Sequence, residues 1–419
     1  MLLIELIGKA YSMHILFLTD NFPPEGNAPA TRTYEHAREW VKLGYKVTII
    51  TGAPNFPEGK VFDGYKNSWF TKETIDGIEV RRVKTYITAN EGFIKRILDF
   101  VSFMITSFIA GLFVKKPDVI IGTSPQFFTV VRAWALSAVR FKPFVFELRD
   151  IWPASITAVG AMKESFAIKL LEKLELFLYR RADLIISVTH AFKRELIGRG
   201  VNANKIEVIL NGVDLSKYQP ACKDTELASK YGLNGKFVAG YIGTHGLAHS
   251  LETLVEAAEI LKDRTDIVFL FAGGGAGSDL VKELVEEKSL DNVVVMGRQD
   301  KALMPRIWSL CDLSLVHLKN VPLFKSVIPS KIFESMGMGI PILIAVPEGE
   351  ATEIVKTTNS GIIVSSEDSS SVANSIIEVI ADPDMLFDLQ QNSKSAANQF
   401  DRSNLASNMC HYISKLNKK

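Results

Sequence analysis

The sequence predicts two successive doubly wound α/β domains, each with a parallel sheet covered by helices. Short apolar runs alternate with stretches of helical periodicity along the chain, and the apolar runs lack the regular polar alternation of half-exposed strands. Such runs suit strands that are buried on both faces, as in a parallel sheet. Turn residues gather at residues 211–214 and at Pro220, so we expect the boundary between the domains at residues 210 and 211.

The expected elements of the first domain, residues 1–210, begin with a strand and alternate from there. Its expected strands are 14–19, 47–51, 78–83, 118–122, 144–148 and 184–188, and its helical patterns include 31–43, 126–141 and 163–181. The second domain, residues 211–419, shows the same alternation of strands and helices. Its expected strands are 237–242, 267–272, 293–296, 313–318, 341–345 and 361–364. We expect the final helix, about residues 400–419, to pack back on the first domain.

Composition agrees with a folded protein of two or three domains. The 419 residues are 47% hydrophobic and 23% charged. The 48 Lys and Arg residues nearly balance 47 Asp and Glu residues, so no overall basic field predicts a nucleic-acid partner. Cys222, Cys311 and Cys410 are too far apart in sequence to suggest a disulfide framework or a metal-ligand motif, which fits a reducing compartment.

Two apolar segments of the first domain need an interpretation. Residues 1–12 lack the basic start and cleavage site of a signal peptide, and Met13 offers a second start before a strand, so we interpret them as a leader of little structural consequence. Residues 100–114 are uncharged but shorter than the about 20 residues of a spanning helix. Their flanks are basic on both sides. They therefore predict either a core helix or a helix on a membrane surface.

The residues after each strand are candidates for ligand binding, because ligands of open α/β sheets bind at the carboxyl ends of strands. With two such domains, a cleft between them is the expected site. The first strand leads into a loop in which Gly26 allows close approach of a ligand, before a helix start that favours anions. An ordinary connecting loop remains the alternative. Arg32 is interpreted either as a phosphate contact or, more commonly, as a solvated side chain.

Charged residues follow directly on the expected strand at 144–148. Burying Glu147, Arg149 and Asp150 is costly unless they are paired or functional. Two interpretations stay open. Arg149 forms a structural ion pair with a neighbouring acid, or Asp150 faces the cleft and handles a substrate hydroxyl.

Glycines follow two strands of the second domain. Gly243 and Gly246 precede a helix, and residues 273–275 are three successive glycines, so both loops suit a diphosphate. Neither loop has the G-x-G-x-x-G pattern, which argues against a nicotinamide dehydrogenase. The sequence also lacks a Walker motif, HExxH and a nucleophile elbow.

The stretch 329–341 is the most informative. Pro329 and Ser330 suit a helix start, which places Lys331 in the first turn, where the helix dipole disfavours a cation unless an anion binds nearby. Glu334 lies one position too far for a capping box with Ser330, so its carboxylate needs another donor. Sugar or ribose hydroxyls would serve, and a solvated glutamate is the alternative.

Taken together, these motifs resemble a retaining family-4 glycosyltransferase of the GT-B superfamily, over nearly the whole chain from Met13. The motifs are the loop at Gly26, residues 211–214 (NGVD), Gly243, residues 273–275, Gly297-Arg298 and the helix of PSKIFE…GMGIPIL. Residues 149–153 and 100–114 are most similar to the subgroup that builds bacterial surface polysaccharides. The likeness is to the N-acetyl-fucosaminyl transferase type of O-antigen enzyme. The resemblance implies two Rossmann-like domains with a cleft between them.

The resemblance also implies roles for individual residues. The implied donor-binding set is Gly26, Asn27, Gly243, Thr244, Gly274, Arg298, Ser326, Val327, Ser330 and Glu334. Glu334 matches the ribose-binding glutamate, whereas Ser326 stands where the family has the acidic residue that faces the donor sugar. The family's arginine and lysine after Gly243 are replaced by Thr244, His245 and His249, so Lys331 is our candidate for the diphosphate. Arg149 replaces a histidine of the catalytic region, and the implied catalytic set is Asp150, Arg149 and Lys331.

The implied reaction transfers a sugar, an N-acetylated amino-sugar or deoxy-sugar, from a nucleoside diphosphate donor, with UDP favoured, to a lipid-linked acceptor. The anomeric configuration is retained, and no metal or other cofactor is expected. The donor binds the second domain and the acceptor the first. The enzyme would act in the cytoplasm, peripherally on the inner face of the bacterial plasma membrane. The alternatives are a sugar-nucleotide 2-epimerase of the same architecture, a dinucleotide-dependent oxidoreductase and a binding protein without catalysis.

Overall fold

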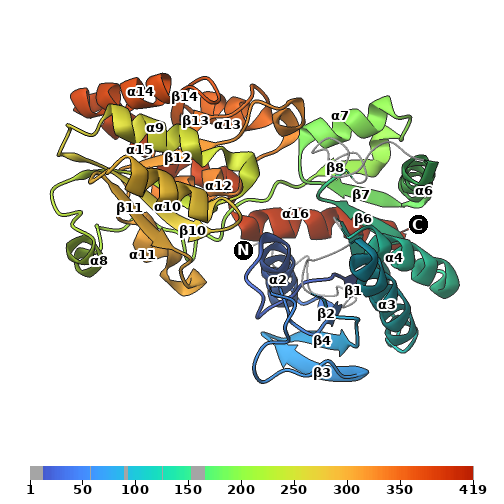
Figure 1. Ribbon diagram of the computed structural model, residues 1–419. Coiled ribbons are helices and arrows are strands. Elements are labelled where there is room, and N and C mark those ends of the chain that lie inside the picture. The colour runs from blue at the N-terminus through green and yellow to red at the C-terminus, as the bar shows by residue number, and fades with distance from the viewer. Residues whose placement is uncertain (1–12, 57, 89–92, 125, 152–165, 419) are drawn as a thin grey trace. The chain divides into compact units, whose positions relative to one another are not determined.

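The chain divides into two compact units, each built around one sheet (Figure 1). One unit comprises Met1–Leu210 and Arg402–Lys419, and the other comprises Asn211–Asp401. The computed structural model describes residues 13–56, 58–88, 93–124, 126–151 and 166–418, so the interpretation of residues 1–12 as a leader lies outside the described residues. Both sheets are predominantly parallel, and the predicted pair of doubly wound α/β domains is confirmed.

The first unit contains an eight-stranded sheet in the order β3-β4-β2-β1-β5-β6-β7-β8. Its strands are β1 (His14–Leu18), β2 (Lys46–Gly52), β3 (Phe70–Ile75), β4 (Ile78–Val83), β5 (Val119–Thr123), β6 (Phe144–Leu148), β7 (Leu184–Ser187) and β8 (Ile206–Val208). β3 runs antiparallel to β4, and the other neighbouring pairs are parallel. The sequence predicted six of these strands but missed β3 and β8, because β3 is largely exposed and β8 has three residues.

Helices cover both faces of this sheet. They are α2 (Ala28–Lys42), α3 (Phe93–Leu112), α4 (Phe127–Arg140), α6 (Phe166–Arg181), α7 (His190–Gly198) and α16 (Arg402–Ser414), with short turns η1 (Ala203–Lys205) and η6 (Lys415–Lys418). One core layer joins the sheet to α2 and α16 through Trp40 and Met409. The other joins it to α3 and α4 through Phe103 and Leu136. Both layers bury apolar side chains on opposite faces of the same strands, as the uninterrupted apolar runs require.

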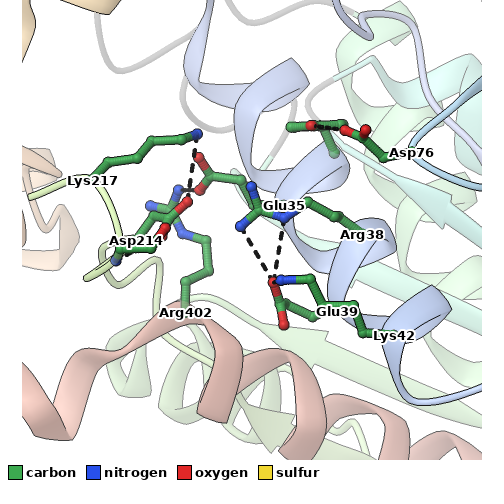
Figure 2. A network of polar contacts seen from close by, with 10 residues as sticks. Glu35, Arg38, Glu39, Lys42, Asp76, Asp214, Lys217 and Arg402 are labelled. Atoms are coloured by element: carbon green, nitrogen blue, oxygen red, sulfur yellow. Dashed lines mark hydrogen bonds and ion pairs between the residues drawn. The ribbon is translucent and has the colours of Figure 1, made fainter.

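The last long helix, α16, belongs to the first unit and packs along α2. The indole nitrogen of Trp40 on α2 donates a hydrogen bond to the carbonyl oxygen of Ala406 over 2.9 Å. Figure 2 shows Arg402, at the start of α16, reaching the carboxylate of Glu35 on α2. These polar contacts and the shared apolar layer hold the end of the chain against the sheet of the first unit.

The predicted segment 100–114 forms most of α3, a helix with one buried and one exposed side. Phe103 and Ser107 are completely buried, whereas the side chains of Ile105 and Ile109 are 52% and 50% exposed. Arg140 donates hydrogen bonds to the carbonyl oxygens of Leu112 and Val114 and so satisfies the end of the helix. In the described part of the chain, no helix combines the length and the apolar character needed to cross a bilayer.

The second unit contains a six-stranded parallel sheet in the order β11-β10-β9-β12-β13-β14. Its strands are β9 (Phe237–Thr244), β10 (Ile267–Gly274), β11 (Val293–Gly297), β12 (Leu313–His317), β13 (Ile342–Ala345) and β14 (Gly361–Ile363). Its α-helices are α8 (Thr225–Lys230), α9 (Leu251–Ile260), α10 (Ser278–Glu287), α11 (Met304–Trp308), α12 (Lys331–Met338), α13 (Glu350–Thr358), α14 (Ser369–Ala381) and α15 (Pro383–Ala397). Short turns are η2 (Leu247–His249), η3 (Lys301–Leu303), η4 (Pro322–Ser326) and η5 (Asn398–Phe400). Buried apolar clusters lie on both faces of this sheet as well.

Candidate functional site

Two glycine-containing segments lie side by side at the carboxyl ends of β9 and β10 in the second unit. Gly243 is paired with Gly273 in the parallel ladder, and their φ angles are 131° and 152°. A Cβ atom on Gly273 would lie 1.7 Å from the carbonyl oxygen of Gly243, so a larger residue does not fit. The backbone nitrogen of His245 donates to the carbonyl oxygen of Gly274 over 3.0 Å. The backbone of both loops is therefore fixed at the sheet edge where α/β domains bind ligands.

Lys331 extends from the first turn of α12 to these glycines. Its side chain is buried, and its Nζ lies 3.2 Å from the centre of the Tyr241 ring. Nζ also lies 3.5 Å from the position that a Cβ atom on Gly243 would occupy. The N-cap residue, Ser330, makes no hydrogen bond through its side chain to the first turn. Lys331 therefore brings an amine, beside backbone N–H groups of a helix start, to the loop that the sequence assigned to a diphosphate.

Glu334 lies one turn further along α12, and Trp308 at the end of α11 is its hydrogen-bond donor. The indole nitrogen of Trp308 donates to Oε2 of Glu334 over 3.3 Å. Burial raises the pKa of the Glu334 carboxyl, while Trp308, Lys301 and Lys331 act in the opposite direction. The sequence predicted that this carboxylate needs a donor from elsewhere. Trp308 supplies one, and a carboxylate can accept further hydrogen bonds from a ligand.

The other predicted donor residues of the second unit occupy two places. Gly274 lies against Arg298, because a Cβ atom on Gly274 would be 3.4 Å from the Cβ of Arg298. This places Arg298, which follows β11, beside the paired glycines of β9 and β10. Ser326 and Val327 lie in the connection between β12 and α12. There the Ser326 hydroxyl donates to the carbonyl oxygen of Leu323 over 2.9 Å.

The histidines that replace the expected basic residues are uncharged in the neutral pH range. Burial is the main cause that lowers the pKa of both His245 and His249 to about 4. Nδ1 of His245 lies 3.2 Å from Oγ of Ser278, and Nδ1 of His249 lies 3.2 Å from the backbone of Gly246. These side chains shape the loop, and they add no positive charge to it at pH 7.

The loop after β1 in the first unit is organised by Glu25, a residue that the sequence analysis did not single out. Its buried carboxylate accepts hydrogen bonds from the side chain of Asn21 and from the backbone nitrogens of Phe22, Asn55 and Phe56, at 2.9–3.2 Å. One carboxylate thus ties the loop after β1 to the loop after β2. A glutamate between two turn-forming residues gives no sequence signal of this role.

The predicted residues Gly26 and Asn27 follow directly. Asn27 is the N-cap of α2, and its side-chain oxygen accepts from the backbone nitrogen of Ala30 over 3.0 Å. Gly26 is exposed. The structure thus gives Asn27 a capping contact, and it places Gly26 at the surface of the loop that Glu25 holds.

The charged residues at the end of β6 differ in burial: Glu147, within the strand, is buried, whereas Arg149 and Asp150, which follow it, are half-buried. Arg32 forms an ion pair with Glu147 over 3.0 Å, and both side chains are 2% exposed. The expectation that Arg32 is solvated was therefore wrong, because the helix start at Ala28 turns it toward the sheet. Nη1 of Arg149 is buried and has no hydrogen-bond partner among the residues described. The backbone nitrogens of Arg149 and Asp150 both donate hydrogen bonds to the hydroxyl oxygen of Ser124, over 2.8 and 3.3 Å.

Asp20, two residues after β1, is a further candidate that the sequence analysis did not single out. Burial raises the pKa of its carboxyl to about 7, with added contributions from Asp99 and Glu25 and an opposing one from Arg132. Tyr241 and Trp308 were also missed, since their roles depend on contacts with α12 rather than on a local motif. Among the described residues, no three His, Cys, Asp or Glu side chains gather as a possible metal site.

Comparison with known protein families identifies the kind of protein to which this site belongs. The model of Glycosyltransferase Family 4 matches residues 29–217, and the model of Glycosyl transferases group 1 matches residues 223–396. The chain carries the two domains of a glycosyltransferase. The residues on β9, β10 and α12 all belong to the group 1 domain, and the loops after β1 and β6 lie within or next to the family 4 domain.

Relatives of this glycosyltransferase include proteins named for polysaccharide synthesis. WcaI of Escherichia coli (strain K12), named for colanic acid biosynthesis, is 24% identical over 335 residues, which are 78% of this chain and 82% of WcaI. TuaH of Bacillus subtilis (strain 168), named for teichuronic acid biosynthesis, is 26% identical over 203 residues. That match covers 48% of this chain and about half, 49%, of TuaH.

The fold is shared with solved glycosyltransferase structures. HepE of Anabaena, solved in complex with UDP and glucose, superimposes with a TM-score of 0.70 at 20% sequence identity. The match covers 96% of this chain and 99% of HepE. At this level of identity the likeness establishes the GT-B fold of the glycosyltransferase.

Proposed function

We propose that this glycosyltransferase transfers an N-acetylated amino-sugar or deoxy-sugar from a UDP-sugar to a lipid-linked acceptor during synthesis of a bacterial surface polysaccharide. The observation that carries the proposal is that Lys331 of α12 reaches the paired glycines at the ends of β9 and β10, with Glu334 in the same first turn of the helix. The names of WcaI and TuaH support the choice of a polysaccharide pathway. The UDP and glucose named with HepE support UDP as the nucleotide.

In the proposed donor site, different residues bind the ribose, the nucleobase, the diphosphate and the sugar of the donor. Glu334 accepts hydrogen bonds from the ribose hydroxyls, with Arg298 on the side of the nucleobase. Gly243, Thr244, Gly274 and the start of α12 offer backbone N–H groups to the diphosphate. Negative charge develops on the diphosphate as the glycosidic bond breaks, and preorganised N–H groups with a nearby lysine stabilise that charge. Backbone at Ser326 and Val327 contacts the donor sugar.

The acceptor part of the proposal concerns the first unit. Asp150 handles the acceptor hydroxyl, and Arg149 adds positive charge beside it. Both follow β6 at the carboxyl edge of the sheet, where α/β domains bind ligands. The new bond forms with retention of the anomeric configuration. The proposed reaction assigns charge stabilisation to Lys331 and to helix starts, so it calls for no metal.

We further propose that the protein works in the cytoplasm, on the inner face of the plasma membrane and without spanning it. Support comes from the exposed side of α3, which carries Ile105, Ile109 and Leu112, followed by Phe113 with 74% of its side chain exposed. Lys115 and Lys116 follow at once and are exposed too. Apolar side chains beside lysines suit the headgroup region of an anionic leaflet, where a lipid-linked acceptor presents its sugar.

A donor screen tests this function. Thermal shift against UDP-, GDP-, ADP- and dTDP-sugars is expected to select UDP-sugars, and the selected donor is then incubated with lipid-linked acceptors. Transfer to the acceptor, with the anomeric coupling of the donor preserved in the product by NMR, is the expected result. Release of an epimerised free sugar nucleotide without acceptor, or no stabilisation by any donor, would contradict the proposal.

A further inference from the structure

The amine of Lys331 is in an unusual position for a lysine. Its side chain is 7% exposed, and Nζ has no hydrogen-bond partner in the part of the chain that the structure describes. The face of the Tyr241 ring lies beneath it, at 3.2 Å from Nζ to the ring centre. Buried polar groups in folded proteins nearly always have a partner, so an unpaired amine at this place requires an explanation.

The titratable groups around Lys331 come from four elements, and none of them forms an ion pair with it among the described residues. Tyr241 belongs to β9, His245 and His249 to the loop and turn after β9, His317 to β12, and Glu334 to α12 itself. Burial lowers the pKa of Lys331 well below its ordinary value, and the charge of Glu334 acts against this shift. The pKa values of the three histidines are lowered as well, by burial first, so they are neutral at pH 7 and above.

Two opposing effects decide the charge of Lys331. Contact with an aromatic face favours the ammonium form of the side chain. Removal of an ammonium from water without a counter-ion disfavours it more strongly, and buried lysines with pKa values of about 5–6 are known. The larger effect favours the neutral amine, whose N–H groups can still point at the ring.

We propose that Lys331 is a neutral amine in the ligand-free protein and takes up one proton from water when a nucleoside diphosphate binds. This inference rests on the proposed function, because it needs the diphosphate to enter beside Gly243 and α12. The phosphate supplies the counter-ion that the protein lacks at this place. Donor binding and protonation of Lys331 are therefore one coupled equilibrium, and the site is selective for a group with full negative charge.

The experiment is calorimetric titration of UDP into the full-length protein at pH 8. At this pH the terminal phosphate is ionised, so UDP itself exchanges almost no proton. The titration is repeated in buffers of different ionisation enthalpy, and the slope of apparent enthalpy against that quantity counts the protons taken up. Uptake of about one proton is expected, and affinity for UDP is expected to fall about tenfold per pH unit between pH 7.5 and 9.

Variants separate the titrating group from its surroundings. Lys331→Arg keeps a permanent positive charge and is expected to bind UDP without proton uptake. Lys331→Met is expected to bind UDP weakly and also without uptake. Lys356→Met, which changes an exposed lysine of α13 in the same unit, serves as the matched control and is expected to behave like the wild type.

The outcomes are distinct. UDP binding to the wild type without proton uptake, or with equal uptake in Lys331→Arg, would overturn this inference and leave the proposed function standing. Failure of UDP, GDP, ADP and dTDP to bind the folded wild type would overturn the proposed function and this inference with it.

Discussion

The indole nitrogen of Trp308 donates a hydrogen bond to the carboxylate of Glu334 over 3.3 Å and fixes one of its oxygens at the start of α12. Glu334 is thus held in place by a residue of a neighbouring helix. A carboxylate that is already oriented loses less entropy when it accepts hydrogen bonds from ribose hydroxyls. This contact links the packing of α11 on α12 to the proposed donor site.

Replacement of Glu334 is expected to weaken donor binding without unfolding the protein. Glu334→Ala removes a charge-assisted hydrogen bond, so UDP affinity should fall by about 1.5–3 kcal/mol in calorimetry. Trp308→Phe keeps the carboxylate but removes its donor, and a smaller loss is expected. Unchanged UDP affinity in a folded Glu334→Ala variant would remove Glu334 from the donor site.

Glu25 is expected to contribute to stability of the first unit. Glu25→Ala leaves the backbone nitrogens of Phe22, Asn55 and Phe56 without their acceptor. One buried donor and two partly buried donors left without their acceptor predict a loss of about 1–3 kcal/mol in the free energy of unfolding. Glu58→Ala, in the same loop region but exposed, is the matched control. Urea unfolding of both variants makes the comparison, and equal midpoints would contradict the role of Glu25.

Asp150 is expected to affect turnover rather than donor binding. Asp150→Asn removes a group that handles the acceptor hydroxyl, and a loss of about 100-fold in kcat is expected at unchanged affinity for UDP. Asp63→Asn, at an exposed aspartate of the same unit, should leave both quantities unchanged. A parallel loss of UDP affinity in Asp150→Asn would place Asp150 in the donor site instead.

The sequence was sufficient to predict most strands of both sheets because their apolar runs are uninterrupted. Strands β6 and β10 show this, with buried side chains along nearly their whole length. Strand β3 was missed for the opposite reason, since FTKETI is largely exposed and reads as a polar loop. Local sequence patterns therefore predicted the buried strands. They did not predict β3, an exposed edge strand that pairs with β4 only.

Residues of the candidate site could be predicted only where their place within a helix or loop already indicates their role. The unfavourable first-turn position of Lys331 and the missing cap of Glu334 were visible in the sequence. The contacts of these residues with Tyr241 and Trp308 were not, because they depend on how α12 packs against β9 and α11. Arg32 shows the same limit, since its ion pair with Glu147 joins residues 115 positions apart.

Replacement of Lys331 is expected to stabilise the fold while impairing catalysis. Burial lowers the pKa of Lys331 in the folded protein, and in the proposed neutral state the unfolded chain binds one proton more than the folded chain at pH values below the ordinary lysine pKa of about 10.4. Stability of the wild type therefore rises with pH over this range by about 1.4 kcal/mol per pH unit relative to Lys331→Met. Urea unfolding at pH 7, 8 and 9 should show the variant as more stable at pH 7, with a gap that narrows as pH rises. A variant with normal turnover would show that Lys331 has no part in the reaction.

Substitutions on α3 test the membrane proposal. Ile105→Glu and Ile109→Glu together place two charges on the exposed apolar side of the helix, and the double variant is expected to lose most of its binding to anionic vesicles. Transfer to a water-soluble acceptor analogue should be unchanged, since α3 binds no substrate in the proposed mechanism.

Ile260→Glu, on α9 of the second unit, is the matched control, because its side chain is 51% exposed against 52% for Ile105. High salt should release the wild type from the vesicles in part, as expected when lysines such as Lys115 and Lys116 contribute. Equal vesicle binding by the double variant and the control would show that α3 is not the membrane surface, and a wild type that ignores anionic vesicles would remove the membrane from the proposed function.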